Sequence, residues 1–447
     1  MTTRRSFLRT TLGAGAGLGL AGTLGGFTAA ASPAGGYKAL VCIKLDGGMD
    51  GHDLLIPTNA GAYAGYAGAR RAILDEHEAR GDDSRSRDAL LALGDASVGM
   101  PRQLAPLAAL YRTGALSVAA NVGPLEERTD RAAVLDRRAS LPLRLFSHND
   151  QRSTWATGEV EQLSEGKGWG GLMMERGPGA PSPYASIAFT NDGVFAAGDG
   201  GAPFRMGTGR LVEPTTSWGQ PDANRLYEEH LTASAARLDN LFATDFQNAQ
   251  RRVIASVETL ADALDGARDG DAVAIPENPL SEQLAMVAKL ISVRARLGVA
   301  RQVFVLNLNG FDTHKNQAAE LPVLQTQLAE AVAAFYRETV RQGVADDVLT
   351  FTTSEFGRTL TPNSNGTDHG WGNHHLLVGG SVRGGRLHGA VPEAGLEHDL
   401  DAGRGRLIPT TATEQYAGGI GRWFGVPEDA LDEILPRRGR FGPALDV

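Results

Sequence analysis

Residues 39–51 read ALVCIKLDGGMDG. The run from 39 to 45 is short and apolar and includes the β-branched Val41 and Ile43. Asp46-Gly47-Gly48 ends it, as expected for a buried strand followed by a tight turn. Four further apolar runs have the same character: LSVAANVG (116–123), QVFVLNLNG (302–310), VLTFTTS (348–354) and HLLVGG (375–380). These five segments predict the strands of a central sheet.

Helical patterns separate these runs, at 101–113, 224–264, 281–298, 319–342 and 410–425. Strands that alternate with helices predict an α/β fold with a largely parallel central sheet and helices on both faces. The region around 185–270 begins with short apolar runs among Gly and Pro, which predicts a small insertion or cap. Residues 75–88 are rich in Asp, Glu and Arg, which predicts a surface insertion.

The N-terminus has the pattern of a targeting segment. Residues 3–9 read TRRSFLR, a Gly/Ala/Leu-rich stretch follows, and small residues end it near Ala31. Together they predict a twin-arginine signal peptide over residues 1–31 and a periplasmic or extracellular location. Retention as an uncleaved anchor is the alternative. No later window approaches the roughly 20 apolar residues of a membrane span, so no integral span is expected after signal removal.

Charge and cysteine content exclude several classes. The net charge is −9, and residues 1–31 carry three arginines and no acid, so the remaining chain has a net charge of −12. An acidic chain without a basic stripe is not expected to bind nucleic acid. Cys42 is the single cysteine, which excludes an intrachain disulfide and a zinc–thiolate site. Any metal site must therefore use His, Asp or Glu.

Residues with ligand-type side chains follow the predicted strands. Because ligands gather at the carboxyl ends of parallel strands, residues far apart in the sequence can meet there. Carboxylates and imidazoles suit a divalent metal such as zinc, calcium or manganese. The predicted metal ligands are Asp312, His314, Glu355, Asp368 and His369, with Asp46, Asp50 or both.

Three further residues are candidates for catalysis. Ser147 precedes a predicted helix, where the positive end of the helix dipole favours an alkoxide, and His148 lies beside it. An ordinary N-cap at Ser147, with Asp150 at N3, explains the same residues. Arg358 either pairs with Glu355 or holds an anionic group with its planar fork.

The ordered motifs resemble those of the DUF1501 proteins, which are bacterial and mostly exported. They are LDGGMDG (45–51), the SH…W element (147–155), GWGG (168–171), GFDTH (310–314), SEFGRT (354–359), DHGWG (368–372) and GRGRLIPTT (403–411). The resemblance spans about residues 1 to 437, and it implies one domain over 36–447 with an alkaline phosphatase/sulfatase-like fold. Two motifs depart from that superfamily. Asp312-Thr313-His314 stands for a pair with three residues between Asp and His, and Glu355-Phe356 stands for Asp-His.

These observations lead to two functional hypotheses. The first is an exported metal-dependent hydrolase of phosphate or sulfate esters, acting on a small-molecule or polymer ester through Ser147 or a water. The second is a non-catalytic envelope protein that keeps a hydrolase-like scaffold for binding or assembly. An oxidoreductase is disfavoured, because the sequence has no dinucleotide fingerprint and no redox cysteine pair.

Overall fold

The computed structural model describes residues 36–94, 97–160, 166–179, 182–208, 241–265 and 276–447, with residues 226, 229 and 267. The predicted signal peptide and part of the predicted cap region lie outside these residues. Within the described chain, none of the helices combines the length and the apolar character that crossing a membrane requires.

The described chain is organised around a nine-stranded sheet. Its order is β13 (Leu387–His388), β5 (Leu116–Gly123), β12 (Asn373–Val378), β9 (Val348–Thr353), β1 (Lys38–Asp46), β8 (Arg301–Asn309), β6 (Ser186–Ala188) and β7 (Phe204–Arg205), and β14 (Thr411–Ala412) also pairs with β5. β1 runs parallel to both β8 and β9, whereas β12 is antiparallel to its two neighbours. The predicted largely parallel sheet is confirmed, and its five predicted strands are β1, β5, β8, β9 and β12.

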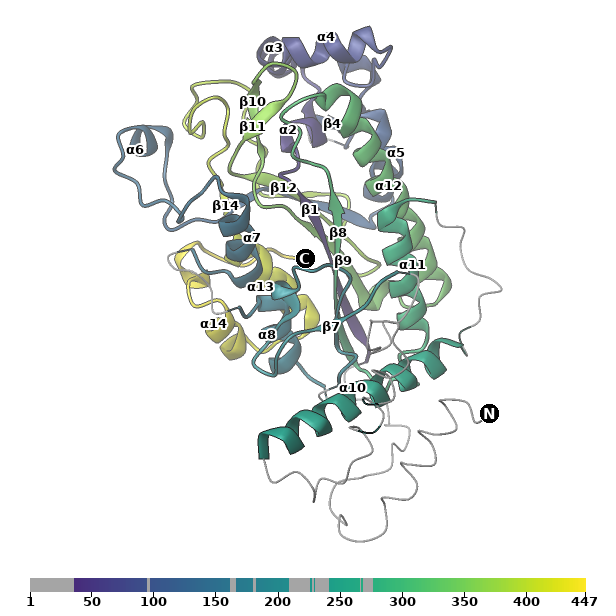
Figure 1. Ribbon diagram of the computed structural model, residues 1–447. Coiled ribbons are helices and arrows are strands. Elements are labelled where there is room, and N and C mark those ends of the chain that lie inside the picture. Colours follow the sequence, from purple (N-terminus) through teal and green to yellow (C-terminus); the bar gives the residue numbers. More distant parts are fainter. Residues whose placement is uncertain are drawn as a thin grey trace.

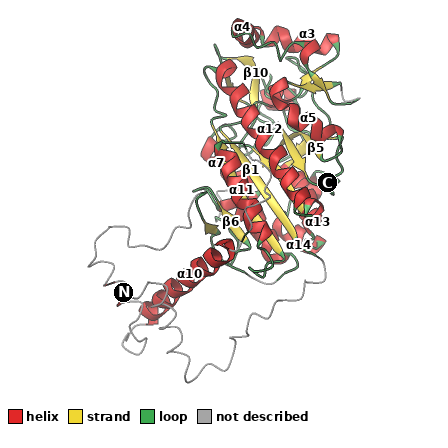
Figure 2. Ribbon diagram, turned by 90° about the vertical axis from the view of Figure 1, so that its right-hand side faces the viewer, coloured by secondary structure: helices red, strands yellow, loops and turns green. Residues whose placement is uncertain are grey.

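Helices cover both faces of the sheet, and β1 shows why. Successive side chains of a strand point to opposite faces, so Val41 and Ile43 join one core while Leu40 and Cys42 join the other. The first core is covered by α5 (Ala105–Arg112), α11 (Pro279–Ser292), α12 (Gln317–Arg341) and the end of α10 (Leu241–Asp265). The second is covered by α7 (His148–Thr157), α8 (Trp169–Arg176), α13 (Thr413–Phe424) and α14 (Glu428–Ile434). Figures 1 and 2 show the resulting three layers.

Smaller elements gather beyond the carboxyl end of β1, at the end of the molecule opposite α10 (Figure 1). They are α2 (Gly51–Leu54), α3 (Ala60–Ala69), α4 (Arg71–Ala79), a small sheet of β2 (Ile56–Pro57), β4 (Val98–Met100) and β3 (Leu91–Ala92), and the hairpin of β10 (Arg358–Pro362) and β11 (Thr367–His369). A short helix, α6 (Arg131–Leu135), lies in the connection from β5 to α7. This end of the sheet carries the candidate site.

Most of the segment 75–88 lies at the surface, as predicted, but the segment is also anchored to the core. Arg85 is buried and pairs with the buried Asp53 at 2.8 Å. Its guanidinium also donates to Gln325 of α12 at 2.7 Å. The charged run is tied to the core because one of its arginines meets a carboxylate that burial would otherwise leave unpaired.

Candidate metal centre

Three ligand atoms converge at the carboxyl edge of the sheet. Asp312 and His314 come from the loop after β8, and His369 ends β11 of the neighbouring hairpin. His314 Nε2 lies 2.9 Å from His369 Nε2 and 3.1 Å from Asp312 Oδ1, and His369 Nε2 lies 3.3 Å from Asp312 Oδ1. We call Asp312 Oδ1, His314 Nε2 and His369 Nε2 the ligand triangle.

The spacing of the ligand triangle matches that around a divalent cation. Metal–ligand bonds of about 2.0–2.1 Å in tetrahedral geometry separate the ligand atoms by roughly 3.3 Å. Two imidazoles and one carboxylate suit zinc or manganese better than calcium, which prefers oxygen ligands. The donor set and its spacing therefore fit the predicted class of metal.

The protonation of His369 is set by its neighbours. Its Nδ1 lies 2.9 Å from the Phe146 carbonyl oxygen, which can only accept a hydrogen bond, so Nδ1 carries the proton. The neutral ring then presents an unprotonated Nε2 to the ligand triangle. Burial lowers the pKa of His369 despite the opposing effect of the Phe146 carbonyl, and Phe356 stacks on the ring at 4.4 Å. His369 is thus held as the neutral imidazole that binds metals.

Arg358 positions Asp312. Its buried guanidinium pairs with Asp312 Oδ1 and donates to the carbonyl oxygens of Gly47, Gly48, Phe311 and Thr367. Partial burial raises the pKa of Asp312, but the hydrogen bond and charge of Arg358 outweigh it and leave that pKa below its ordinary value. Arg358 contacts the backbone of three segments, so it is placed to hold an ionised Asp312 and not to face a substrate.

The turn after β1 permits this close packing. Gly47 has a φ of +118°, and a Cβ there would lie 2.3 Å from the Asp312 backbone nitrogen. Only glycine can adopt this conformation and leave room for the second backbone. The double glycine of the opening motif therefore seats the loop that carries Asp312 against β1.

His148, the first residue of α7, lies beside the ligand triangle. Its Nε2 is 3.5 Å from Asp312 Oδ2, and its Nδ1 is 3.4 Å from Glu355 Oε1. One ligand atom from each of His148, Asp312 and His369 lies within 4.8 Å of the others. His148 can thus act as a further ligand or as a proton carrier next to one.

Asp368, a predicted ligand, lies behind His314. Its Oδ1 is 3.8 Å from His314 Nδ1, the nitrogen that faces away from the ligand triangle. Its Oδ2 pairs with Arg404 at 3.0 Å and with Arg406 at 3.8 Å. At this distance Asp368 places negative charge behind the imidazole without a hydrogen bond to it.

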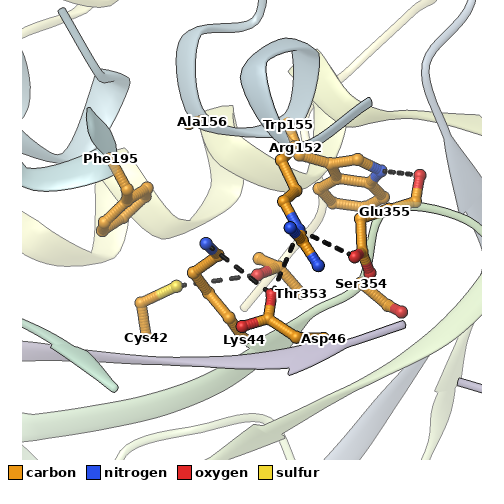
Figure 3. A pocket seen from close by; sticks show the side chains of 10 residues that line it. All are labelled: Cys42, Lys44, Asp46, Arg152, Trp155, Ala156, Phe195, Thr353, Ser354 and Glu355. Carbon is orange, nitrogen blue, oxygen red and sulfur yellow. Dashed lines mark hydrogen bonds and ion pairs between the residues drawn. The ribbon is translucent and has the colours of Figure 1, made fainter. Parts of the chain in front are cut away.

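Two more predicted ligands, Asp46 and Glu355, already face cations of the chain. Glu355 accepts hydrogen bonds from the Gly47 and Gly48 N–H groups at 3.0 and 3.1 Å and from Arg152 Nε at 2.9 Å. Asp46 Oδ1 is 3.7 Å from both Lys44 Nζ and Arg152 Nε. Figure 3 shows Arg152 between the two carboxylates in a small pocket. We call Asp46, Glu355, Lys44 and Arg152 the compensated pocket.

The two carboxylates of the compensated pocket differ in pKa. Burial raises the pKa of Asp46, and Lys44 offsets this only in part. Burial also opposes ionisation of Glu355, but its hydrogen bonds to His148 and to backbone N–H groups lower its pKa overall. The hydrogen bonds that Glu355 accepts, and not only the nearby cations, distinguish its environment from that of Asp46.

Asp50 and Ser147 have partners outside the ligand triangle. Asp50 is buried, caps α2 by accepting from the His52 N–H, and pairs with Arg70 through both oxygens. Ser147 is the N-cap residue of α7, and its hydroxyl donates to Asp150 Oδ2 at 2.5 Å. Asp50 thus caps a helix with its side chain, whereas Ser147 holds the N-cap position without a side-chain hydrogen bond to the backbone of α7.

The sequence analysis missed four basic residues near the site: Lys44, Arg152, Arg404 and Arg406. A signal existed for Arg152, which follows His148 by four residues and therefore shares its face of α7. A signal also existed for Lys44, which lies two residues before Asp46 in β1 and therefore shares its face of the strand. Arg404 and Arg406 lie in a loop that meets the site only in the folded chain.

The fold and the site thus define the class: an α/β protein with a carboxylate–imidazole cluster at the carboxyl edge of its sheet. The chain belongs to the family described as "Protein of unknown function (DUF1501)", whose model matches residues 133–435. No curated protein matches the chain.

Several solved structures show a likeness over most of the chain, and three of them illustrate its extent. The PsFucS1 sulfatase from Pseudoalteromonas sp. is 13% identical, with a TM-score of 0.31, over 88% of this chain and 68% of that one. The C-terminal periplasmic domain of EcEptC from Escherichia coli, a complex with Zn, is 10% identical, with a TM-score of 0.30, over 77% and 74%. The lipoteichoic acid synthase LtaP from Listeria monocytogenes is 7% identical, with a TM-score of 0.33, over 88% and 75%.

Proposed function

We propose that this protein is an exported metal-dependent hydrolase of phosphate or sulfate esters. The observation that carries the proposal is the ligand triangle, in which three atoms from two separate segments lie 2.9–3.3 Å apart. The resemblance of the family motifs to the alkaline phosphatase/sulfatase superfamily supports the ester class.

Asp312, His314 and His369 would hold the cation. When bound, a divalent cation polarises an ester oxygen and lowers the pKa of a water molecule. The residues behind the ligands prepare them: Arg358 keeps Asp312 ionised, and the Phe146 carbonyl fixes the tautomer of His369. Such outer contacts raise affinity because the ligands need not reorganise when the metal binds.

His148 is the candidate for proton transfer. Glu355 can accept a hydrogen bond from its Nδ1, which leaves Nε2 directed toward Asp312 at 3.5 Å. From there the ring can take a proton from an attacking water and return it to the leaving group. Water is the nucleophile in this proposal, because the Ser147 hydroxyl is engaged by Asp150.

The proposal is tested by assaying p-nitrophenyl phosphate and p-nitrophenyl sulfate with protein loaded with zinc or manganese. We expect turnover that a chelator abolishes and that the matching metal restores. His148→Ala should lower kcat by about 100-fold or more, whereas Ser147→Ala should retain most of it. A protein that binds no zinc or manganese, or one inert in the loaded state, would contradict the proposal.

A specific observation favours a second candidate, a non-catalytic envelope protein for binding or assembly. Lys44 and Arg152 neutralise Asp46 and Glu355, so these two predicted ligands are closed to a further cation. If the loaded protein turns over neither ester, while His314→Ala abolishes the phenotype of the host cell and Ser147→Ala does not, the second candidate is preferred.

A further inference from the structure

A closed network of ion pairs connects the compensated pocket with the ligand triangle. Lys44 joins Asp192 to Asp46, Arg152 joins Asp46 to Glu355, and His148 joins Glu355 to Asp312. Asp312 then pairs with Arg358 and contacts His314, and Asp368 links His314 to Arg404 and Arg406. Each ion pair that these charged side chains make in the described chain lies within the network.

The charges of this network balance. It contains five carboxylates (Asp46, Asp192, Asp312, Glu355, Asp368) and five cations (Lys44, Arg152, Arg358, Arg404, Arg406). Counted over these ten side chains, the network carries no net charge. A divalent cation in the ligand triangle would therefore add two positive charges that no side chain of the network offsets.

Arg152 belongs to the same network and has hydrogen-bond donors to spare. Its Nε donates to Glu355 at 2.9 Å, whereas its two terminal amino groups make no hydrogen bond within the described residues. The side chain is 35% exposed. It lies one helical turn after His148, and both residues contact Glu355 Oε1. The contact through Nε holds the guanidinium beside Glu355 (Figure 3).

We propose that the metal-loaded site selects a dianion, a phosphate monoester over a sulfate ester or a phosphodiester, and that Arg152 binds its non-bridging oxygens. This inference rests on the proposed function and names its substrate class. A phosphate monoester carries close to two negative charges above pH 7 and has three acceptor oxygens. A sulfate ester and a phosphodiester each carry one charge and leave one positive charge uncompensated. The planar fork of an arginine matches two phosphate oxygens.

The first test compares two ligands that share a phenyl ring and cannot be hydrolysed. Phenylphosphonate, doubly charged at about pH 8.5, and benzenesulfonate, singly charged, are titrated calorimetrically into the full chain loaded with zinc. We expect phenylphosphonate to bind at least about tenfold more tightly, and to lose this preference when a chelator removes the zinc. Equal or tighter binding of benzenesulfonate would overturn the inference.

The second test assigns the donor. Arg152→Gln should weaken the binding of phenylphosphonate about tenfold or more, while the affinity for zinc stays within about threefold of the parent. Arg152→Lys should bind phenylphosphonate with an affinity between those of Arg152→Gln and the parent. Arg144→Gln is the matched control, because Arg144 lies just before the same helix but pairs with Asp150 outside the network. An Arg152→Gln protein that folds, binds zinc and binds phenylphosphonate like the parent would overturn the assignment.

The outcomes separate the two proposals. Zinc-dependent phenylphosphonate binding without turnover of phenyl phosphate keeps the inference and contradicts the hydrolase. Turnover of phenyl sulfate with preference for benzenesulfonate keeps the hydrolase and contradicts the inference.

Discussion

The ligand triangle and the compensated pocket lie on the same edge of the sheet and use the same kinds of residue, but their carboxylates face different neighbours. Asp312 faces two imidazole nitrogens at 3.1 and 3.3 Å. Asp46 and Glu355 face Lys44 and Arg152. Acidic residues at strand ends therefore do not define a metal site by themselves. Asp312 also pairs with the cation Arg358, so a cation beside a carboxylate does not close the site; what decides is whether imidazole nitrogens converge on the same carboxylate oxygen.

Removal of Arg358 should have the largest effect on stability. This side chain contacts both the Gly47–Gly48 turn, which binds Glu355, and Asp312 of the ligand triangle. Arg358→Met should lower the free energy of unfolding by about 3–5 kcal/mol, since four carbonyl groups lose their buried donor at once. Urea unfolding measures it. Arg404→Met, which removes an exposed partner of Asp368, should cost less than about 1 kcal/mol. Equal costs would show that Arg358 does not organise the edge.

Loss of an imidazole from the ligand triangle should weaken zinc binding, and loss of a histidine outside it should not. His314→Ala should weaken zinc affinity by about 100-fold or more, because it removes one of three ligand atoms. His398→Ala, outside the ligand triangle, is the control. Competition with a chromophoric chelator gives both constants. If the two variants bind zinc alike, the metal is not in the ligand triangle.

A double-mutant cycle tests whether Arg152 stabilises Glu355 in the compensated pocket. Arg152→Met and Glu355→Gln should each destabilise the protein, and together by less than their sum, with a coupling free energy of about 1–2 kcal/mol. Chemical unfolding of the four proteins gives this value. A coupling near zero would mean that Arg152 does not compensate Glu355.

The smallest expected effect is a pH dependence of opposite sign for the two carboxylates. The pKa of Asp46 is raised above its ordinary 3.8, so its contribution to stability is present below that pH and is lost as pH rises through the raised pKa. The pKa of Glu355 is lowered from 4.5, so its contribution is present above 4.5 and is lost as pH falls through the lowered pKa.

The free energy of unfolding, measured across about pH 3.5 to 7 with a chelator present to keep the protein free of metal, tests this prediction. Relative to the parent, Asp46→Asn should gain stability with rising pH and Glu355→Gln should lose it. Parallel trends would show that the two carboxylates share one environment.

The sequence predicted the fold well because strand burial is a local signal. Runs such as 39–45 and 302–310 are apolar along their whole length, as strands covered on both faces must be. The antiparallel direction of β12 was beyond prediction, because it depends on how the chain returns through the β10–β11 hairpin.

The site was predicted less completely, for a physical reason. Residue type and position after a strand identified Asp312, His314 and His369 as candidates, and the structure brings these three together. The same reasoning could not tell Asp312 from Asp50, because the partner of Asp50 is Arg70, which comes from another helix junction. Pairing with distant arginines decides each carboxylate's role, and such pairing leaves no local pattern.

The most direct test is a crystal structure of the full chain soaked in zinc, with anomalous scattering data collected at the zinc absorption edge. A peak about 2.0–2.2 Å from Asp312 Oδ1, His314 Nε2 and His369 Nε2 is the expected result. A map with no peak there, or with its peak between Asp46 and Glu355 instead, would contradict the account.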